Sequence, residues 1–462
     1  MTEFGFWFAT IVFIGTYVLI ASEKVHKTTA ALVGSSLMLL FVLPGPHNTG
    51  LFFADHPSWL TEEFTFITSH NAPLDVYARY VNFDVIFTLA GMMLLVNILS
   101  GTGVFQYVAI KCAKVAKGSP IRTMILLVAA TAALSAFLDN VTTVLLIAPV
   151  TMIVASEMKL NSLPFLMAET MASNIGGTAT LIGDPPNLII GSVANLGFMS
   201  FLLNLGWVIV IFMIIYCVIL KFWYGKKMHV TVEQRARIME LDERAAITDP
   251  YNMKRGVFVI SLTIVGFLLH SLIGIQPCVV AMAGAALALL ICRVNVDHSL
   301  EKIEWSTLFF FLGLFILVRG AEYGGLMDRV GVLLQGTYSW HPLVFILALM
   351  WISALAAAIT NNVSYTAAMV AVISVYLRGN PAFAGSPELQ QLAWWGLALA
   401  VCLGGNGTLV GAAANLVTAG IAGKAGVDVS FRKFMVYGLP VTFGTMVAAT
   451  AYIVLRYYVM IK

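Results

Sequence analysis

Residues 173–187 read SNIGGTATLIGDPPN. The glycine pair at 176–177 permits non-helical backbone and close approach of a neighbouring chain. The proline pair at 185–186 removes two backbone donors and keeps the preceding residue out of helical geometry. Apolar sequence flanks the motif on both sides. A helix must therefore break inside a hydrophobic region, where its free backbone groups need protein or water as partners.

The composition of the whole chain identifies a membrane protein. Of 462 residues, 60% are hydrophobic and 11% are charged, with a net charge of +3 and a mean hydropathy of +0.90. Soluble domains carry about 25% charged residues, so this chain has too little charge for a water-exposed surface. A soluble, collagen-like, disordered or disulfide-stapled protein is excluded. No basic tract indicates a nucleic-acid partner, which leaves the lipid bilayer as the expected surroundings.

Apolar runs of about 17–25 residues predict membrane spans. They lie near 5–22, 28–44, 83–100, 205–223, 256–273, 277–292, 305–320 and 435–459. The first run lacks a basic leader and a small-residue cleavage site, so it is expected to be a retained helix. Two further apolar regions, 121–203 and 342–422, are interrupted by polar residues, Gly or Pro. Each predicts a re-entrant hairpin followed by a broken helix.

The two interrupted regions match each other in sequence. Residues 139–142 (DNVT) match residues 361–364 (NNVS) at a shift of 222. Residues 174–188 match CLGGNGTLVGAAANL at 402–416 at a shift of 228, with seven of 15 positions identical. An odd number of predicted crossings separates the copies. The predicted fold is an all-α polytopic membrane protein with two inverted repeats, each with a re-entrant hairpin and a broken transmembrane helix, as in secondary transporters.

This repeat divides the chain into predicted segments. They are N-terminal scaffold helices (1–44), an outer segment (45–82), repeat 1 (83–223, hairpin about 121–158, broken helix about 163–203), a cytoplasmic linker (224–255), scaffold helices (256–292) and repeat 2 (305–459, hairpin about 342–378, broken helix about 393–422). With the N-terminus outside, all but six of the 26 basic residues fall on the inner side; the six are Arg79, Arg319, Arg329, Arg378, Arg456 and Lys462. This bias predicts a multi-pass protein of the cell (inner) membrane. The linker is expected to be a solvated connector with a short helix, and docking of an ATPase subunit there is left open.

The motif FLDNVTT at 137–143 forms the predicted tip of the first hairpin. Asp139 is suited to binding a proton or Na⁺, with Asn140, Thr142 and Thr143 as oxygen ligands or substrate contacts. An ionised carboxylate in a membrane costs at least about 2.5–3.5 kcal/mol, so a partner is expected. The alternative is that Asp139 caps the second arm of the hairpin as an N-cap residue.

The broken helices supply the other candidate binding residues. In repeat 1 they are Asn174, Gly176, Gly177, Thr178, Thr180, Asp184 and Asn187; in repeat 2 they are Gly405, Asn406, Thr408 and Asn415, with Asn361, Asn362 and Ser364 at the hairpin tip. Asp184 is a second candidate proton or cation carrier, or alternatively a structural turn or cap. Asp139 and Asp184 correspond to Asn361 and Ala412. The titratable groups are thus confined to repeat 1, which predicts a proton or Na⁺ site there beside a mainly neutral surface in repeat 2.

Three further groups of ionisable or thiol-bearing residues lie outside these motifs. Glu169 is a candidate second proton carrier. Arg319 and Glu322, at i and i+3, are expected to pair with each other. The five scattered cysteines predict small core residues, with thiol ligation of a soft substrate as the alternative. The loosely spaced histidines of 45–82 give no metal site.

These motifs resemble those of the ion transporter superfamily, and within it the ArsB/NhaD permease family, in the arsenical-pump-like and P protein-like branch. The resemblance spans roughly residues 20 to 460, and its specific motifs lie in 137–187 and 361–415. It implies a substrate bound between the hairpin tips and the broken helices, and a homodimer formed through scaffold helices. Related carriers bind Na⁺ through Ser-Asn-Thr motifs at the tips, where this chain has Asp139-Asn140-Val141-Thr142. The acid favours a proton-linked or cation-linked cycle.

The leading functional hypothesis is proton- or potential-driven efflux of arsenite, antimonite or a related small oxyanion. A Na⁺/H⁺ antiporter is the alternative, and uptake of an organic or inorganic anion comes third. No cofactor is expected beyond the coupling H⁺ or Na⁺. An intramembrane aspartyl protease would need the signature GxGD, with Gly at the position of Leu181. The chain is therefore not expected to be an enzyme.

Overall fold

The computed structural model describes residues 3–22, 25–43 and 80–461, and within them every regular element is a helix. The predicted all-α fold is confirmed. Most of the predicted outer segment 45–82 lies outside the described residues, as do Arg79 and Lys462.

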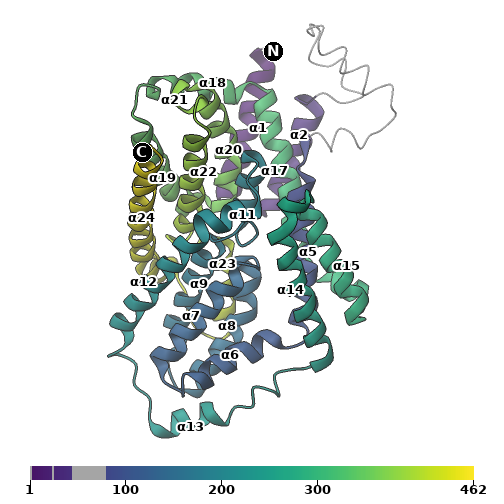
Figure 1. Ribbon diagram of the computed structural model, residues 1–462. Helices are drawn as coiled ribbons and strands as arrows, with labels where there is room; N and C mark the ends of the chain where they lie inside the picture. The colour runs from purple at the N-terminus through teal and green to yellow at the C-terminus, as the bar shows by residue number, and fades with distance from the viewer. Residues whose placement is uncertain (1–2, 23–24, 44–79, 462) are drawn as a thin grey trace. The chain divides into compact units, whose positions relative to one another are not determined.

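The helices follow the chain in the order labelled in Figure 1. Their bounds are α1 Glu3–Ser22, α2 Lys27–Phe41, α5 Phe83–Ser100, α6 Val104–Val115, α7 Pro120–Ser135, α8 Asn140–Glu157, α9 Leu163–Gly177, α10 Pro185–Ala194, α11 Phe198–Phe201, α12 Trp207–Tyr224, α13 Val232–Glu240, α14 Pro250–Ile273, α15 Pro277–Cys292, α16 Val296–Glu301, α17 Trp305–Tyr323, α18 Leu326–Leu334, α19 Pro342–Thr360, α20 Asn362–Gly379, α21 Pro381–Ala384, α22 Pro387–Gly404, α23 Ala413–Lys424 and α24 Phe431–Ile461. A π-helical turn, Leu202–Gly206, joins α11 to α12, and a 3₁₀ turn, Gln335–Thr337, follows α18. Many of these helices begin with proline at the first or second position, where its missing N–H costs nothing.

Seven helices in the described part of the chain are long and apolar enough to cross a membrane. They are Phe83–Ser100, Asn140–Glu157, Phe198–Tyr224, Pro250–Ile273, Trp305–Tyr323, Pro342–Thr360 and Phe431–Met460. Shorter apolar helices cover Gly5–Ile20, Lys27–Phe41, Pro120–Ser135 and Pro277–Cys292. Large apolar side chains on α12 point outward, including Phe222 at 82% exposed. This outward apolar surface fits lipid, and the multi-pass prediction is confirmed.

The chain packs as two compact units. The first comprises Met1–Ile86, Glu304–Pro342 and Thr366–Gln390. In it α1, α2 and α17 pack against one another, and Gly313 lets α17 approach the backbone of Ala31. The predicted pair forms on α17, where Arg319 lies 2.7 Å from Glu322.

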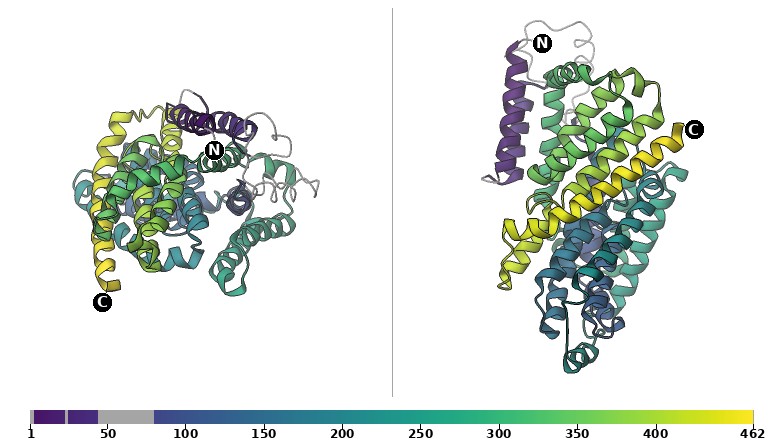
Figure 2. Two further views of the ribbon diagram at one scale, coloured as in Figure 1. Left: turned by 90° about the horizontal axis from the view of Figure 1, so that it is seen from above. Right: turned by 90° about the vertical axis from the view of Figure 1, so that its left-hand side faces the viewer.

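The second unit comprises Phe87–Ile303, Leu343–Tyr365 and Gln391–Lys462, and it holds every candidate site residue. Within it α9 packs against α7, α8 and α23, and the long α24 lies along α12 (Figures 1 and 2). These units follow packing, whereas the repeats were defined by sequence. The inverted relation and the repeat boundaries therefore stay predictions.

Both predicted helix breaks are present in the second unit. The helix α9 ends at Gly177 and α10 begins at Pro185; α22 ends at Gly404 and α23 begins at Ala413. Each is preceded by a helical hairpin, α7–α8 or α19–α20, that turns sharply at its tip.

The linker after α12 forms the predicted short helix, α13, which begins with a capping box between Thr231 and Gln234. It is more than a solvated connector, because Ile238 is fully buried against Ala113 of α6 and Val154 of α8. The helix α6 was not predicted, because Gln106, Lys111 and Lys114 divide it into apolar runs that are too short to predict a span.

Salt bridges complete the docking of the linker. Glu243 lies 2.5 Å from the Nζ of Lys114 and 3.3 Å from that of Lys111, both on α6. The hydrogen bond from Lys114, with help from Lys111, lowers the pKa of the Glu243 carboxyl to about 2. The linker is therefore held to α6 by charge as well as by its buried isoleucine.

Candidate functional site

Each break is closed by an asparagine that follows it. The Nδ2 of Asn187 donates to the carbonyl of Thr180 at 2.9 Å and, at 3.3 and 3.4 Å, to the carbonyls of residues 178 and 177. The Nδ2 of Asn415 donates to the carbonyls of Gly405 and Thr408, both at 2.8 Å. These carbonyls lie at or beyond the end of the helix, where no helical N–H reaches them, and the side-chain amide supplies the missing donor. Two matching asparagines thus do the same work in the two copies.

Glycine lets each broken helix touch the first arm of its hairpin. A Cβ on Gly176 would collide with the backbone of Ala132, and one on Gly404 with the backbone of Ala354. The two alanines match at the shift of 222 that relates the hairpins. The glycines are thus needed for close packing.

Threonine fastens the same two pairs of segments. The hydroxyl of Thr180 donates to the carbonyl of Ala136, and that of Thr408 donates to the carbonyl of Ala358. Each acceptor lies at the end of a first hairpin arm, four residues beyond the alanine that faces the glycine. The break and the hairpin tip are therefore joined directly in both copies.

The two breaks are also joined to each other. The Nδ2 of Asn174 donates to the Oδ1 of Asn415 at 3.0 Å, and the thiol of Cys402 donates to the Oδ1 of Asn187 at 3.4 Å. Residues 174 and 402 hold matching positions at the shift of 228. The contact is thus reciprocal, with an amide donor in one direction and a thiol in the other.

Asp184 lies at the centre of this arrangement and is fully buried. Its carboxyl accepts from the Nδ2 of Asn140 at 3.3 Å and from the Nδ2 of Asn362 at 3.3 Å, so it contacts the tips of both hairpins. The thiol of Cys402 also interacts with this carboxyl electrostatically. Although Asp184 occupies the N-cap position of α10, its side chain makes no capping bond. The interpretation of this side chain as a helix cap is therefore wrong.

Amides extend the contacts of Asp184 into a connected set. Asn140 donates to the Oδ1 of Asn174 at 3.0 Å, and Asn174 donates to the Oδ1 of Asn406 at 2.8 Å. We call Asp184 and the asparagines at 140, 174, 362, 406 and 415 the asparagine network. All six residues are at most 2% exposed.

Asp139 does not share this position. Its Oδ1 accepts from the backbone N–H of Thr142 at 2.8 Å and its Oδ2 from the hydroxyl of Thr142 at 2.5 Å, which caps α8. The capping interpretation of Asp139 is confirmed. The hydroxyl of Thr143 donates to the backbone carbonyl of Asp139 at 2.9 Å. Asp139 is partly exposed and acts on Asp184 only through its charge, so its role as an ion carrier stays a prediction.

The second hairpin tip turns in a different way. Asn361 adopts a φ of +74°, a left-handed conformation that asparagine tolerates better than most residues. Its Oδ1 accepts from the N–H of Val363 at 3.1 Å, and the N–H of Asn362 donates to the carbonyl of Gly411 at 2.9 Å. Ser364 is buried one turn into α20. This tip is thus fastened to the second break through its backbone.

Other polar groups support the site without joining the network. Thr178 donates back to the carbonyl of Asn174 at 2.8 Å. Ser173 donates to the carbonyl of Asn140 at 3.0 Å, and Ser135 donates to the carbonyl of Ser173 at 2.7 Å. The two serines and Cys402 were not among the predicted site residues. Cys402 could have been found from its alignment with Asn174, whereas the serines carry no such sign.

The network has one carboxyl and no basic partner. Among residues 3–22, 25–43 and 80–461, no ion pair involves Asp184 or Asp139. The same residues contain no group of three His, Cys, Asp or Glu that could hold a metal. The chemistry available is therefore that of amide donors and acceptors around a single acid.

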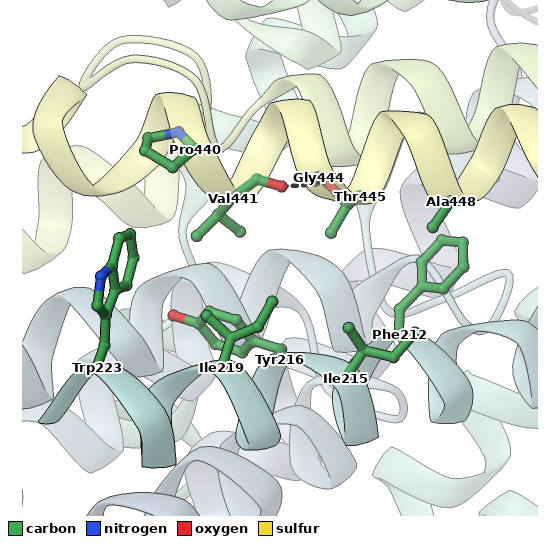
Figure 3. A pocket seen from close by; sticks show the side chains of 10 residues that line it. All are labelled: Phe212, Ile215, Tyr216, Ile219, Trp223, Pro440, Val441, Gly444, Thr445 and Ala448. Atoms are coloured by element: carbon green, nitrogen blue, oxygen red, sulfur yellow. Dashed lines mark hydrogen bonds between the residues drawn. The ribbon is translucent and has the colours of Figure 1, made fainter. Parts of the chain in front are cut away.

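Three cavities lie elsewhere in the second unit. One of 260 Å³ between α12 and α24 is lined by apolar side chains, with Thr445 bonded to the carbonyl of Val441 (Figure 3). One of 720 Å³ beside α7 and α12 reaches Thr180, and one of 570 Å³ lies between α8 and α23. None of the three is lined by the asparagine network. The six residues of the network are at most 2% exposed, so in this conformation the network is closed to solvent.

Comparisons with known proteins assign the chain to a family. A family model described as "Citrate transporter" (CitMHS) matches residues 17–395. The chain is 38% identical over 452 residues to a 46 kDa membrane protein of Mycobacterium leprae, covering 98% of this chain and 99% of the relative. An uncharacterized transporter of Mycobacterium tuberculosis is also 38% identical over 453 residues, with the same coverage.

Two more distant matches also cover almost all of this chain. The P protein of Sus scrofa is 30% identical over 531 residues, which cover 98% of this chain and 59% of that protein. The solved YdaH transporter of Alcanivorax borkumensis has a TM-score of 0.60 at 13% identity and 98% coverage of both chains, which shows a shared fold. The family and its relatives are transporters, which confirms that the chain is not an enzyme. The chain is a secondary membrane transporter, and it belongs to the citrate transporter family of the ion transporter superfamily.

Proposed function

We propose that this transporter couples H⁺ or Na⁺ at the first break to a small inorganic solute at the second. The observation that carries the proposal is the position of Asp184, which accepts hydrogen bonds from Asn140 and Asn362, one at each hairpin tip. Binding of a cation or proton to this carboxyl would change what both tips contact. Ala412 holds the matching position at the second break, so only the first break has this acid.

The two breaks differ in the groups they offer. After Asp184, the prolines at 185 and 186 have no N–H, so α10 begins without the donors that favour an anion. The oxygens of the Asp184 carboxyl suit a proton or a hard cation such as Na⁺. The helix α23 begins at Ala413 with backbone N–H groups that have no intrahelical partner. That end, close to Asn406, suits the oxygens of a solute.

The charge of the network favours arsenite or antimonite as the solute. A citrate-like polyanion would have to bind beside a carboxyl with no basic side chain paired to it. Arsenous acid is uncharged and hydroxylated, and it needs only the donors and acceptors that amides provide. We therefore assign the chain efflux of arsenite, antimonite or a related small oxyanion, in the manner of the ArsB/NhaD family. Moving one charge across 100 mV supplies about 2.3 kcal/mol, more than the about 1.4 kcal/mol of a tenfold gradient.

Na⁺/H⁺ antiport is the second candidate, because one carboxyl flanked by amides would let Na⁺ and H⁺ compete for Asp184. Uptake of an organic or inorganic anion is the third, supported by the family description, and it would require a cation to travel with the anion.

The experiment uses the purified chain in proteoliposomes with an imposed pH gradient. Arsenite, Na⁺ and citrate are supplied separately, and solute and proton fluxes are recorded. Arsenite accumulation that depends on the gradient, and falls at least tenfold in Asp184→Asn, is expected. The exposed Asp428→Asn is the matched control and should transport normally. Na⁺-dependent proton release without arsenite would establish the antiporter, and citrate flux the anion carrier.

The predicted charge distribution assigns the chain to the inner membrane with its N-terminus outside. Homodimerisation through the scaffold helices and docking of an ATPase subunit on the linker 226–255 belong to the same proposal. Labelling of a single cysteine introduced at Thr231 in intact cells tests the orientation, because Thr231 is exposed on the linker. Crosslinking in native membranes tests both associations.

A further inference from the structure

The helix α9 carries a second buried carboxyl outside the asparagine network. Glu169 is 3% exposed, and its Oε1 accepts from the hydroxyl of Thr151 on α8 at 2.7 Å. Its Oε2 is buried and has no hydrogen-bond partner among the described residues. A buried polar atom without a partner is unfavourable, so this carboxyl oxygen requires an explanation, such as a bound proton, water or ion.

Glu169 is linked to the network by a single stretch of helix. It lies five residues before Asn174 and eight before Gly177. At 1.5 Å per residue, it is about 12 Å along the helix from the break. Any change in how Glu169 holds α9 is therefore transmitted to Asn174 through continuous helix.

A polar layer surrounds Glu169 where α8, α9 and α23 meet. The neighbouring Thr170 shares a hydrogen bond of 2.6 Å with Thr418 of α23. The three helices pack against one another, as Figure 1 shows. Buried hydroxyls from two other helices thus meet α9 at this level.

The cavity between α8 and α23 lies along the same stretch of these two helices. It has a volume of 570 Å³ and is lined on α8 by residues from Pro149 to Glu157 and on α23 by Ile421 and Lys424. Thr151 lies within that stretch of α8, and Thr418 lies one turn before Ile421. Pro149 also leaves one α8 carbonyl without its helical donor. The cavity therefore lies on the exposed face of the stretch of α8 that holds Thr151, and neither Thr151 nor Glu169 lines it.

The second repeat shows that packing does not need this carboxyl. At the shifts that relate the copies, Glu169 corresponds to Leu397 and Thr151 to Ile373, and both are buried. Hydrocarbon therefore fills the matching positions. The acid and its hydroxyl partner are an addition that belongs to the first repeat alone.

We propose that Glu169 is a proton-binding site of the transport cycle, separate from Asp184. The inference rests on the proposed proton coupling. The proton binds to Oε2 while Oε1 continues to accept from Thr151. Gain and loss of this proton change the charge between α8 and α9, and so bias the position of α9 and its Asn174.

Few other titratable groups face Glu169. Cys112 on α6 interacts with it electrostatically, and on α12 the hydroxyl of Tyr216 donates to the carbonyl of Ala168 at 3.4 Å. The remaining charged residues of the helices around α9 lie toward helix ends: Arg122 on α7, Glu157 on α8, Lys221 on α12, Lys424 on α23, and Arg432, Lys433 and Arg456 on α24. Glu169 is therefore the acid available to a proton at this depth.

The test compares Glu169→Gln, which keeps the volume and an acceptor for Thr151, with wild type. Proteoliposomes carry arsenite, Na⁺ or citrate, whichever probe the wild type transports. We expect gradient-driven accumulation to fall at least tenfold in Glu169→Gln, while exchange of labelled for unlabelled probe stays within about threefold. Thr151→Val is the matched variant, and it should shift the pH at which transport is half-maximal without abolishing it. Infrared difference spectra of the purified protein should lose one titrating carboxyl band in Glu169→Gln.

The outcomes separate this inference from the proposed function. If gradient-driven transport and the carboxyl band are unchanged in Glu169→Gln while Asp184→Asn abolishes transport, Glu169 is a structural residue and the inference is wrong. If the wild type moves none of the three probes in response to a pH gradient, the proposed function fails first. If Glu169→Gln does not fold, Glu169→Leu, which copies the second repeat, replaces it, and the spectroscopic band decides.

Discussion

The amide of Asn174 donates to the Oδ1 of Asn415 across 3.0 Å, and this bond joins the helix before the first break to the helix after the second. The return contact, from Cys402 to Asn187, uses a thiol at 3.4 Å. A thiol is the weaker donor. The helix after the first break is thus bonded to the other copy more weakly than the helix after the second.

Removal of the closing asparagines should show this difference. Asn415→Ala leaves two buried carbonyls without the 2.8 Å bonds that satisfied them, at about 1–3 kcal/mol for each unsatisfied group. The Nδ2 of Asn187 has two N–H groups, one in a bond of 2.9 Å and one shared between two longer contacts, so Asn187→Ala should destabilise less. Thermal unfolding of the two variants in detergent measures the order. Equal destabilisation would show that the two breaks are held equally, and a reversed order would show that the first is held more firmly.

Alanine at the two packing glycines should destabilise the protein. Gly176→Ala and Gly404→Ala each place a methyl group against backbone atoms of a hairpin arm, which cannot move aside as a flexible side chain can. Overpacking of this kind costs about 1–3 kcal/mol. Gly444→Ala on α24 is the control, because a Cβ there has nothing within 4 Å. The apparent melting temperature should fall for the first two variants only.

Substitution of Asp139 and of Asp184 distinguishes the acid that caps a helix from the proposed ion carrier. Asn is a good N-cap residue, so Asp139→Asn should keep α8 and the fold intact. Transport that persists with unchanged pH dependence in Asp139→Asn, together with loss in Asp184→Asn, is the expected result. A flux assay across pH decides it. Loss of pH dependence in Asp139→Asn would instead identify Asp139 as the carrier.

Cys402 should report on opening of the network. The thiol is fully buried, so N-ethylmaleimide should label it slowly in the conformation described. Turnover in proteoliposomes is expected to raise the labelling rate, because transport must expose the network. The labelling rate is measured in a variant whose other four cysteines are changed to alanine. The control is the same variant with Asp184→Asn added. Labelling that is equally fast without turnover would contradict a closed network.

Acid should release the linker from α6. The salt bridge to Lys114 lowers the pKa of Glu243 to about 2, below the about 4.3 of a free glutamate. For a lowered acid pKa, the contribution to docking is complete above the unfolded value and is lost as pH falls through the folded one. Proteolysis of the linker should therefore accelerate between about pH 5 and pH 2. Glu243→Gln should be cut rapidly already at neutral pH, and a flat pH profile in the wild type would refute the bridge.

Local chemistry explains why much of this fold could be predicted. The breaks at 177–185 and 404–413 follow from glycines, prolines and the matching motifs, which act within a few residues. The hairpin tips were found for the same reason. The cap formed by Asp139 was one of two interpretations, and only coordinates could separate them.

The unpredicted features depend on contacts between distant segments. Docking of Ile238 on α6 and the pairing of Thr151 with Glu169 leave no mark in the spacing of residues. Cys402 lies beside Asp184 because the segments around the two breaks pack against each other. The composition of the chain alone predicted only that Cys402 is a small core residue. The candidate list was therefore right about which segments build the network and incomplete about which side chains meet.

The asparagine network is complete in itself, since each amide takes as partner another part of the same chain. In the proposed cycle, a solute that binds the network has to replace those internal partners one for one, so its net gain in free energy over the empty carrier is small. Modest affinity is the natural outcome, and selectivity then depends on the number and direction of oxygens that a solute presents. Such a carrier would release its solute easily on the far side of the membrane, because the network residues can form their hydrogen bonds to one another again.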